Sequence, residues 1–193
     1  PRLFHTRGAD QRRNLAVSPT AAAILLGRPP NPAAVAAVAA ELVVPGRFQV
    51  LDGPAPPVTV LDGAHNPDGA RALAESLPEF LGGRPLHVVV SILDDKDAAA
   101  MLAALLPLAS RLVCTAAANP RALPPATLAS LARQLGAGPT FEDDGAAEVE
   151  PDPRRALALA RAGGPDAVVL ATGSLYLVAD LLRPASAGRG SIL

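Results

Sequence analysis

Apolar runs and helix-length stretches alternate along the chain from Arg47 onward, and this alternation restricts the possible folds more than any other feature. The runs are short, rich in Val, Leu and Ile, and bounded by Gly, Pro, Asn or Asp, as strands commonly are. Strands are predicted at 48–51, 58–61, 86–93, 111–116, 140–142 and 166–172, and helices at 66–81, 98–109, 124–134, 152–162 and 175–182. Since helices between strands provide crossovers, the pattern predicts an α/β fold with a mostly parallel sheet. The first two strands have no helix between them and predict an N-terminal hairpin.

Residues 1–45 differ from the rest of the chain. Two Ala-rich helices are predicted at 14–26 and 32–44, separated by the break Gly27-Arg28-Pro29-Pro30. Helices with almost no polar face cannot bury themselves, so these are predicted to belong to another domain or to a lid against one. The predicted division is 1–45 for the terminal helices of that domain, 46–184 for the α/β domain and 185–193 for a flexible tail.

Composition excludes several classes of protein. The chain has 17 Lys and Arg against 18 Asp and Glu, with no basic block, which argues against a nucleic-acid surface. A hydrophobic content of 50% argues against disorder, because burial can offset the entropy lost on folding. The apolar stretch 167–182 is too short and too interrupted to cross a membrane. Cys114 is the only cysteine and can form no internal disulfide, so a cytoplasmic protein is expected.

Polar residues follow three of the predicted strands, at the positions where open α/β sheets bind ligands. After the strand at 58–61 come Asp62 and His65, which can point into one crevice, and Asp62 is suited to accept hydrogen bonds from ribose hydroxyls. The structural alternative is that Asp62 and Asn66 cap the turn and His65 packs. The residues alone leave both interpretations open.

Three further candidates also have a structural alternative. Asp94-Asp95-Lys96-Asp97 contains the only lysine, but by charge pattern alone it is more typical of a solvated turn before a helix. Thr172-Gly173-Ser174 opens the last helix, where free amides and a hydroxyl can bind a carboxylate or phosphate, or where Ser174 simply caps. Arg47, in a turn between the two parts of the chain, could reach a phosphate.

Several common functional motifs are absent from the sequence. It has no G-x-x-x-x-G-K-[ST] phosphate loop, no G-x-G-x-x-G, no Cys/His metal cluster and no G-x-S-x-G elbow. One hypothesis is therefore a stand-alone module that binds a nucleotide or an amino acid without catalysis. A hydrolase built from Ser174, His65 and Asp62 is a weaker hypothesis, because no elbow motif surrounds the serine.

Four motifs, in this order and spacing, resemble one known family. They are Pro45-Gly46-Arg47, Leu61-Asp62-Gly63-Ala64-His65-Asn66-Pro67, Asp95-Lys96-Asp97 and Gly173-Ser174-Leu175-Tyr176-Leu177-Val178. They are similar to the C-terminal half of folylpolyglutamate synthase/dihydrofolate synthase, in the ATP-dependent Mur ligase superfamily, as is the stretch 119–123. The first helix resembles the end of that family's central ATPase domain. The chain departs from the family at Asp10, where the family has His, and at Ser91, where it has Gly.

The resemblance implies a fold and a set of site residues. The fold would be the Rossmann-like, three-layer Mur ligase C-terminal domain preceded by two helices. The residues expected to contact ATP are Asn14, Arg47 at the phosphates and Asp62 at the ribose. The expected catalytic residues are His65, Lys96 and Ser174. The expected substrate-binding residues are Ser174, for the carboxylate of glutamate, with Tyr176 and His65. No metal ligand is expected in this chain.

The implied reaction is the ATP-dependent addition of glutamate to folate, or to dihydropteroate, through an acyl phosphate. Mg²⁺ would be held mainly by a phosphate-loop ATPase domain upstream of Pro1, and the complete enzyme is expected to be a monomer. Another Mur-type ligase is the sibling hypothesis. The chain would supply one wall of an active site, with charge stabilisation and positioning as the main sources of catalysis.

Overall fold

The computed structural model describes residues 9–42, 44–51, 56–136 and 147–184, with side chains from residue 16 onward. The elements, in chain order, are α1 (Ala9–Leu26), α2 (Pro32–Glu41), β1 (Gln49–Leu51), β2 (Val58–Leu61), α3 (Pro67–Leu81), β3 (Leu86–Val90), α4 (Ala98–Leu105), the 3-10 helix η1 (Leu106–Leu108), β4 (Arg111–Cys114), α5 (Pro125–Gln134), β5 (Glu148–Val149), α6 (Pro153–Arg161), β6 (Val168–Thr172) and α7 (Leu175–Leu182).

The strands form one sheet of six in the order β1-β2-β6-β3-β4-β5. All neighbours are parallel except β1 and β2, which form an antiparallel pair with Gln49 opposite Leu61. The predicted α/β fold with a mostly parallel sheet and an N-terminal hairpin is therefore confirmed. The last strand of the chain, β6, lies between β2 and β3 near the centre of the sheet.

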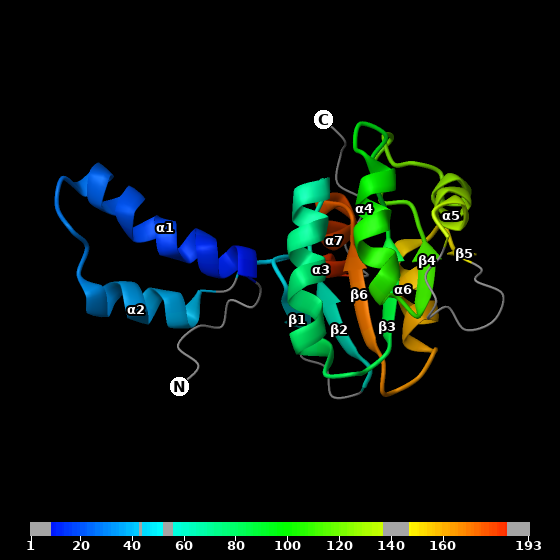
Figure 1. Ribbon diagram of the computed structural model, residues 1–193, viewed down its shortest axis with the longest axis horizontal. Coiled ribbons are helices and arrows are strands. Elements are labelled where there is room, and N and C mark those ends of the chain that lie inside the picture. Colours follow the sequence, from blue (N-terminus) through cyan, green and yellow to red (C-terminus); the bar gives the residue numbers. More distant parts are fainter. Residues whose placement is uncertain (1–8, 43, 52–55, 137–146, 185–193) are drawn as a thin grey trace.

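Helices cover both faces of the sheet, which gives three layers (Figure 1). Val168 and Leu170 of β6 pack in a core with α3, α4 and α5, whereas Val169 and Ala171 pack in a second core with α6 and α7. Strands buried on both faces need apolar residues at every position, because successive side chains point to opposite faces. This requirement explains the continuous apolar runs of β3 and β6 in the sequence.

The helices α1 and α2 extend away from the sheet (Figure 1), and α1 contacts α3. Their apolar side chains are largely uncovered by the described residues: Ile24 is 80% and Leu25 87% exposed, and Val38 is also exposed. The second helix ends at Glu41, earlier than the predicted 44, because Leu42 has an extended backbone. Within the described residues, no helix combines the length and apolar character needed to span a membrane.

One predicted strand is clearly shorter in the structure. The strand predicted at 86–93 ends at Val90, because the next residues bond to another loop: the Leu123 amide donates to the Ile92 carbonyl, and Leu93 forms a bridge with Ala122. The strand predicted at 140–142 lies outside the described residues and stays a prediction. Within the described residues, β5 pairs with Val113 and Cys114 on β4.

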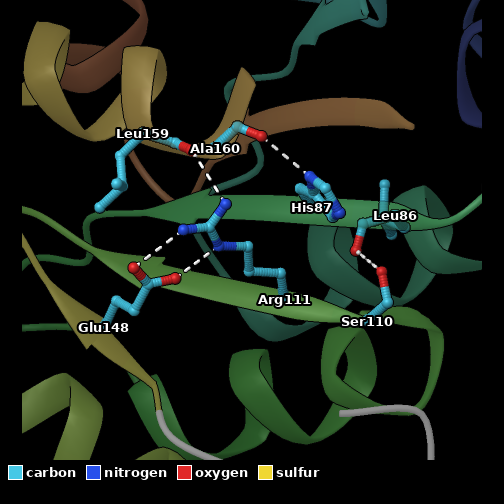
Figure 2. A network of polar contacts seen from close by, with 7 residues as sticks. All are labelled: Leu86, His87, Ser110, Arg111, Glu148, Leu159 and Ala160. Carbon is cyan, nitrogen blue, oxygen red and sulfur yellow. Dashed lines mark hydrogen bonds and ion pairs between the residues drawn. The ribbon is translucent and has the colours of Figure 1, made fainter. Parts of the chain in front are cut away.

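A polar network lies at the amino ends of β3 and β4 (Figure 2). Arg111 donates to both carboxylate oxygens of Glu148, at 2.5 and 2.9 Å, and to the Leu159 carbonyl at 3.0 Å, while His87 Nδ1 donates to the Ala160 carbonyl at 2.8 Å. These carbonyls belong to the last turn of α6, where Ala160 also accepts from the Gly163 amide at 3.4 Å, so the network anchors the end of α6 to the sheet. The hydrogen bond to Glu148 raises the pKa of Arg111.

Gly173, directly after β6, is the point of closest approach to the loop after β3. Its φ is 98°, and a Cβ at this position would lie 2.6 Å from the Ser91 carbonyl oxygen. Only glycine accommodates both this backbone and this contact. Ser91 accepts a hydrogen bond from the Ala117 amide on Oγ at 2.9 Å. The loops after β6, β3 and β4 are thus fixed to one another.

Replacement of Arg111 by methionine is expected to destabilise the domain by about 1–3 kcal/mol, because the half-buried Glu148 carboxylate and the Leu159 carbonyl of α6 lose their hydrogen-bond donor. The free energy of unfolding is measured by urea denaturation. Arg155→Met, at an exposed position of α6, is the matched control and should change stability by no more than about 0.5 kcal/mol. Equal stability of the two variants would contradict the anchoring role.

Gly173→Ala is expected to cost about 2–4 kcal/mol of stability, because it adds a steric clash with the backbone of Ser91 to a disfavoured φ. Gly83→Ala separates these two effects, since Gly83 has a φ of 85° but no described atom lies within 4 Å of the place that a Cβ would occupy. The control should lose only about 1 kcal/mol. The measurement is the urea midpoint of each variant, and equal losses would show that the close approach is unimportant.

Candidate functional site

The loops that carry the predicted site residues meet at one edge of the sheet. Parallel strands end on the same side, and the backbone ladder continues past them: the Asp62 amide donates to the Ala171 carbonyl at 3.0 Å, and the Ser91 amide donates to the Thr172 carbonyl at 3.2 Å. We call the loops that follow β2, β6, β3 and β4 the carboxyl edge. The three clusters picked out from the sequence therefore lie on adjacent loops.

Asp62 organises the start of this edge. The side chain is 7% exposed, Oδ2 accepts a hydrogen bond from the Phe48 amide at 2.8 Å, and Oδ1 accepts one from the Ala64 amide at 2.8 Å. The proposed structural role of Asp62 as a cap is thus confirmed.

Arg47 lies in a turn that is packed against two other elements. Gly46 has a φ of 68°, and a Cβ there would lie 2.8 Å from Val178 Cγ1 on α7. The Gly63 amide donates to the Gly46 carbonyl at 2.7 Å, which joins this turn to the loop after β2. The Arg47 side chain is half-buried, and its guanidinium makes no hydrogen bond or ion pair with any residue that the structure describes. A rigid backbone thus presents a cation that is available to an anion.

His65 is held in one tautomer. Its Nδ1 lies 2.8 Å from the Gly63 carbonyl oxygen, which can only accept, so Nδ1 carries the proton. In the neutral ring, Nε2 then presents a lone pair. The following residue, Asn66, caps α3 by accepting from the Gly69 amide at 2.8 Å. The half-buried imidazole can therefore act as an acceptor at the carboxyl edge.

Lys96 is paired within its own loop. Its Nζ lies 2.9 Å from Asp95 Oδ2, and Arg121 Nη1 lies 3.3 Å from the same oxygen. The hydrogen bond from Lys96 lowers the pKa of Asp95 below its usual value, and the charge of Arg121 contributes in the same direction. Asp97 caps α4 by accepting from the Ala100 amide. The solvated-turn interpretation accounts for Asp97, whereas Lys96 has a definite partner.

Ser174 and Tyr176 begin α7. Ser174 is 1% exposed, and its Oγ accepts from the Tyr176 amide at 3.1 Å, so Ser174 is the N-cap of this helix. Tyr176 is 45% exposed. Immediately before this turn, Thr172 Oγ1 is buried and has no hydrogen-bond partner among the described residues.

Asn14 is the remaining residue predicted from the sequence. Asn14 lies on α1, but its side chain falls outside those that the structure describes. Among the described residues, no three His, Cys, Asp or Glu side chains lie together in a way that could hold a metal ion. The carboxyl edge thus brings together the loops of Arg47, Asp62, His65, Lys96 and Ser174, and leaves the position of Asn14 relative to them undescribed.

Sequence reasoning gave no role to two residues of this edge. The Phe48 amide donates a hydrogen bond to Asp62. Arg121 forms an ion pair with the Asp95 carboxylate, which Lys96 also contacts. Arg121 lies in the stretch 119–123, whose resemblance to the family was the available signal. Phe48 gave no signal beyond its position next to Arg47.

Comparison with known proteins identifies the domain. The family described as Mur ligase, glutamate ligase domain matches residues 46–175. A probable bifunctional folylpolyglutamate synthase/dihydropteroate synthase of Haloferax volcanii is 41% identical over 136 residues, which cover 70% of this chain and 15% of that protein.

Two solved structures are also similar. Mycobacterium tuberculosis folylpolyglutamate synthase, complexed with ADP and AMPPCP, matches with a TM-score of 0.80 and 29% identity, over 92% of this chain and 40% of that one. A bifunctional folylpolyglutamate synthase/dihydrofolate synthase with Mn, AMPPNP and L-glutamate bound matches with a TM-score of 0.69 and 29% identity, over 84% and 37%. This chain spans well under half the length of these relatives. It belongs to the Mur ligase family, with a glutamate ligase domain that matches the C-terminal part of folylpolyglutamate synthase/dihydrofolate synthase.

Proposed function

We propose that this chain is the C-terminal part of a cytoplasmic, ATP-dependent ligase that adds glutamate to folate, and that it supplies one wall of the active site. The observation that carries the proposal is the meeting of the Arg47, His65, Lys96 and Ser174 loops at the carboxyl edge. There, a guanidinium without a partner among the described residues and an available imidazole nitrogen lie on adjoining segments. The relatives named above, one of them with a nucleotide analogue and L-glutamate bound, support the same reaction.

In the proposed reaction, a carboxylate oxygen of the folate or dihydropteroate attacks the γ-phosphorus of ATP. The bond to the β,γ-bridging oxygen breaks, and an acyl phosphate and ADP form. The amino group of glutamate then attacks the acyl carbon, phosphate leaves, and the nitrogen loses a proton to give the amide. Arg47 and Asp62 would bind the nucleotide phosphates and ribose, as would Asn14 from α1. Ser174, with Tyr176, would bind the glutamate carboxylate through its remaining hydroxyl proton and the α7 amides.

His65 and Lys96 would complete the site. The Nε2 lone pair of His65 can accept a hydrogen bond from the incoming amine, and the ammonium of Lys96 can balance the negative charge of the reacting groups. Closure of this domain over the ATP would exclude water, which would otherwise hydrolyse the acyl phosphate.

The described residues do not fit a magnesium site, because no suitable group of carboxylates or imidazoles is present among them. The ligands of Mg²⁺ would therefore come from an ATPase domain other than the domain described here. The apolar surface of α1 and α2 supports the inference of such a domain, since side chains such as Ile24 and Leu25 need a partner to cover them. We infer that these helices are the last elements of that ATPase domain.

The direct test combines this chain with a cognate phosphate-loop ATPase domain and measures ADP release with folate and glutamate. We expect turnover that depends on both substrates and on both parts. A panel of amino-acid and carboxylate substrates separates the folate branch from other Mur-type ligases. A well-folded, assembled pair with no turnover would overturn the proposal, and binding without turnover would favour the non-catalytic module.

Arg47→Ala should lower kcat/KM for ATP in that ligase by about 10- to 100-fold, because a charge-assisted contact to phosphate is lost. The KM for glutamate should stay unchanged. Arg133→Ala, at an exposed site in the last turn of α5, removes the same charge away from the carboxyl edge and should leave both parameters unaffected. Equal behaviour of the two variants would exclude Arg47 from phosphate binding.

Lys96→Met should raise the pKa of Asp95 toward its ordinary value of 3.8, because the hydrogen bond that favours the carboxylate is removed. Since the folded pKa lies below the unfolded one, the pair contributes to stability above the unfolded pKa and loses that contribution as the pH falls through the folded pKa. The pKa is read from the carboxyl carbon by NMR titration. Arg121→Met should give a smaller rise and Arg133→Met none. An unchanged pKa in Lys96→Met would show that the pair does not form in solution.

A further inference from the structure

Phe48 has an unusual backbone for its residue type. Its φ is 45°, and among the residues described by the structure it is the non-glycine residue with a positive φ. This left-handed region is disfavoured for residues with a Cβ, and strain of this kind persists only where the surroundings impose it. Phe48 directly follows Arg47, and Gly46 on the other side has a φ of 68°.

Two contacts impose the conformation of Phe48. Its amide donates to the buried carboxylate of Asp62 at 2.8 Å, a charge-assisted hydrogen bond. Its ring is buried in the core and meets the Phe80 ring edge-on, with centroids 5.3 Å apart and an interplanar angle of 87°. The amide and the side chain of the same residue are therefore held from two different elements, the loop after β2 and helix α3.

The consequence falls on Arg47. Rotation about the N–Cα bond of Phe48 moves everything that precedes this bond relative to the Phe48 ring and to β1. With the ring fixed in the core, the φ of Phe48 therefore sets the direction of Arg47. The guanidinium has no side-chain partner among the described residues, so no second contact fixes its place, and the backbone sets the point and direction from which the Arg47 side chain extends.

We propose that Phe48 is a positioning residue for Arg47: its buried ring and its hydrogen bond to Asp62 hold the turn in the conformation that presents the guanidinium to a phosphate. The inference rests on the proposed function only for the identity of the anion. The positioning itself is a property of this chain.

Amide hydrogen exchange of the chain tests the positioning without any activity. The Arg47 amide donates to the Val44 carbonyl and the Gly63 amide to the Gly46 carbonyl, so both report the turn. In Phe48→Ala, both amides should exchange about tenfold faster under conditions where local opening dominates. Leu128→Ala, which removes a fully buried side chain from α5, is the matched control and should leave these two amides unchanged. Phe48→Leu, which keeps a large apolar side chain, should restore most of the protection.

A double-mutant cycle in the assembled ligase tests the consequence for the nucleotide. Phe48→Ala should raise the KM for ATP about tenfold and leave the KM for glutamate unchanged, and it should have no further effect in an Arg47→Ala background. Unchanged exchange of both amides in Phe48→Ala, or an equal rise of KM in both backgrounds, would overturn the inference.

These outcomes separate the two proposals. If Arg47→Ala itself leaves the KM for ATP unchanged, the phosphate contact in the proposed function is wrong, and the exchange experiment alone decides whether Phe48 holds the turn. If Arg47→Ala raises the KM but Phe48→Ala does not, the proposed function stands and the positioning role is wrong. Should Phe48→Ala fail to fold, Phe80→Leu, which removes the ring that meets Phe48 edge-on, provides the same comparison with a smaller loss.

Discussion

The carboxylate of Asp62 is the interaction on which the geometry of the carboxyl edge depends. It binds the amides of Phe48 and Ala64, one on each side of the hairpin that opens the domain. A buried carboxylate without these donors would be very unfavourable, and the two amides without the carboxylate would be unsatisfied. The turn before β1 and the loop after β2 therefore form together. Arg47 and His65, which lie on these two segments, take their relative positions from this shared contact.

The edge also depends on glycines whose neighbours, a side chain or a backbone, occupy the place of a Cβ. Gly46 lies against Val178, Gly63 against Leu175 and the Gly46 carbonyl, and Gly173 against the Ser91 carbonyl. The first two contacts join helix α7 to the turn before β1 and to the loop after β2, and the third joins the loops after β6 and β3. Ser91 adds a hydrogen bond from the Ala117 amide to its hydroxyl. This bond fixes the loop after β4 to the loop after β3.

Much of the architecture was predictable, because it follows from local patterns. Continuous apolar runs require strands buried on both faces, and helices between them require parallel pairing. The clusters at Asp62, Lys96 and Ser174 could be placed on one edge from that topology alone. The end of β3 could not be predicted in this way. Ile92 and Leu93 are apolar enough for a strand, but they leave the sheet and bond with the loop that contains Ala122 and Leu123. Local pattern carries no information about such long-range partners.

The partners of charged residues were unpredictable for the same reason. Asp95 stands beside Lys96 in the sequence, but the third member, Arg121, comes from another loop. The left-handed backbone of Phe48 likewise arises from a carboxylate and an aromatic ring that lie elsewhere in the chain. In both cases the residue type was compatible with many surroundings, and tertiary contacts selected one.

The glycines of the edge leave little freedom for change over evolution. A new side chain at Gly173 would displace the backbone of Ser91, so this loop cannot be reshaped to suit a different ligand. Leu175 and Tyr176 lie in the same turn but are exposed, and their side chains can vary without disturbing the backbone. Divergence among enzymes built on this domain should therefore accumulate at the exposed first turn of α7, while the frame around it stays constant.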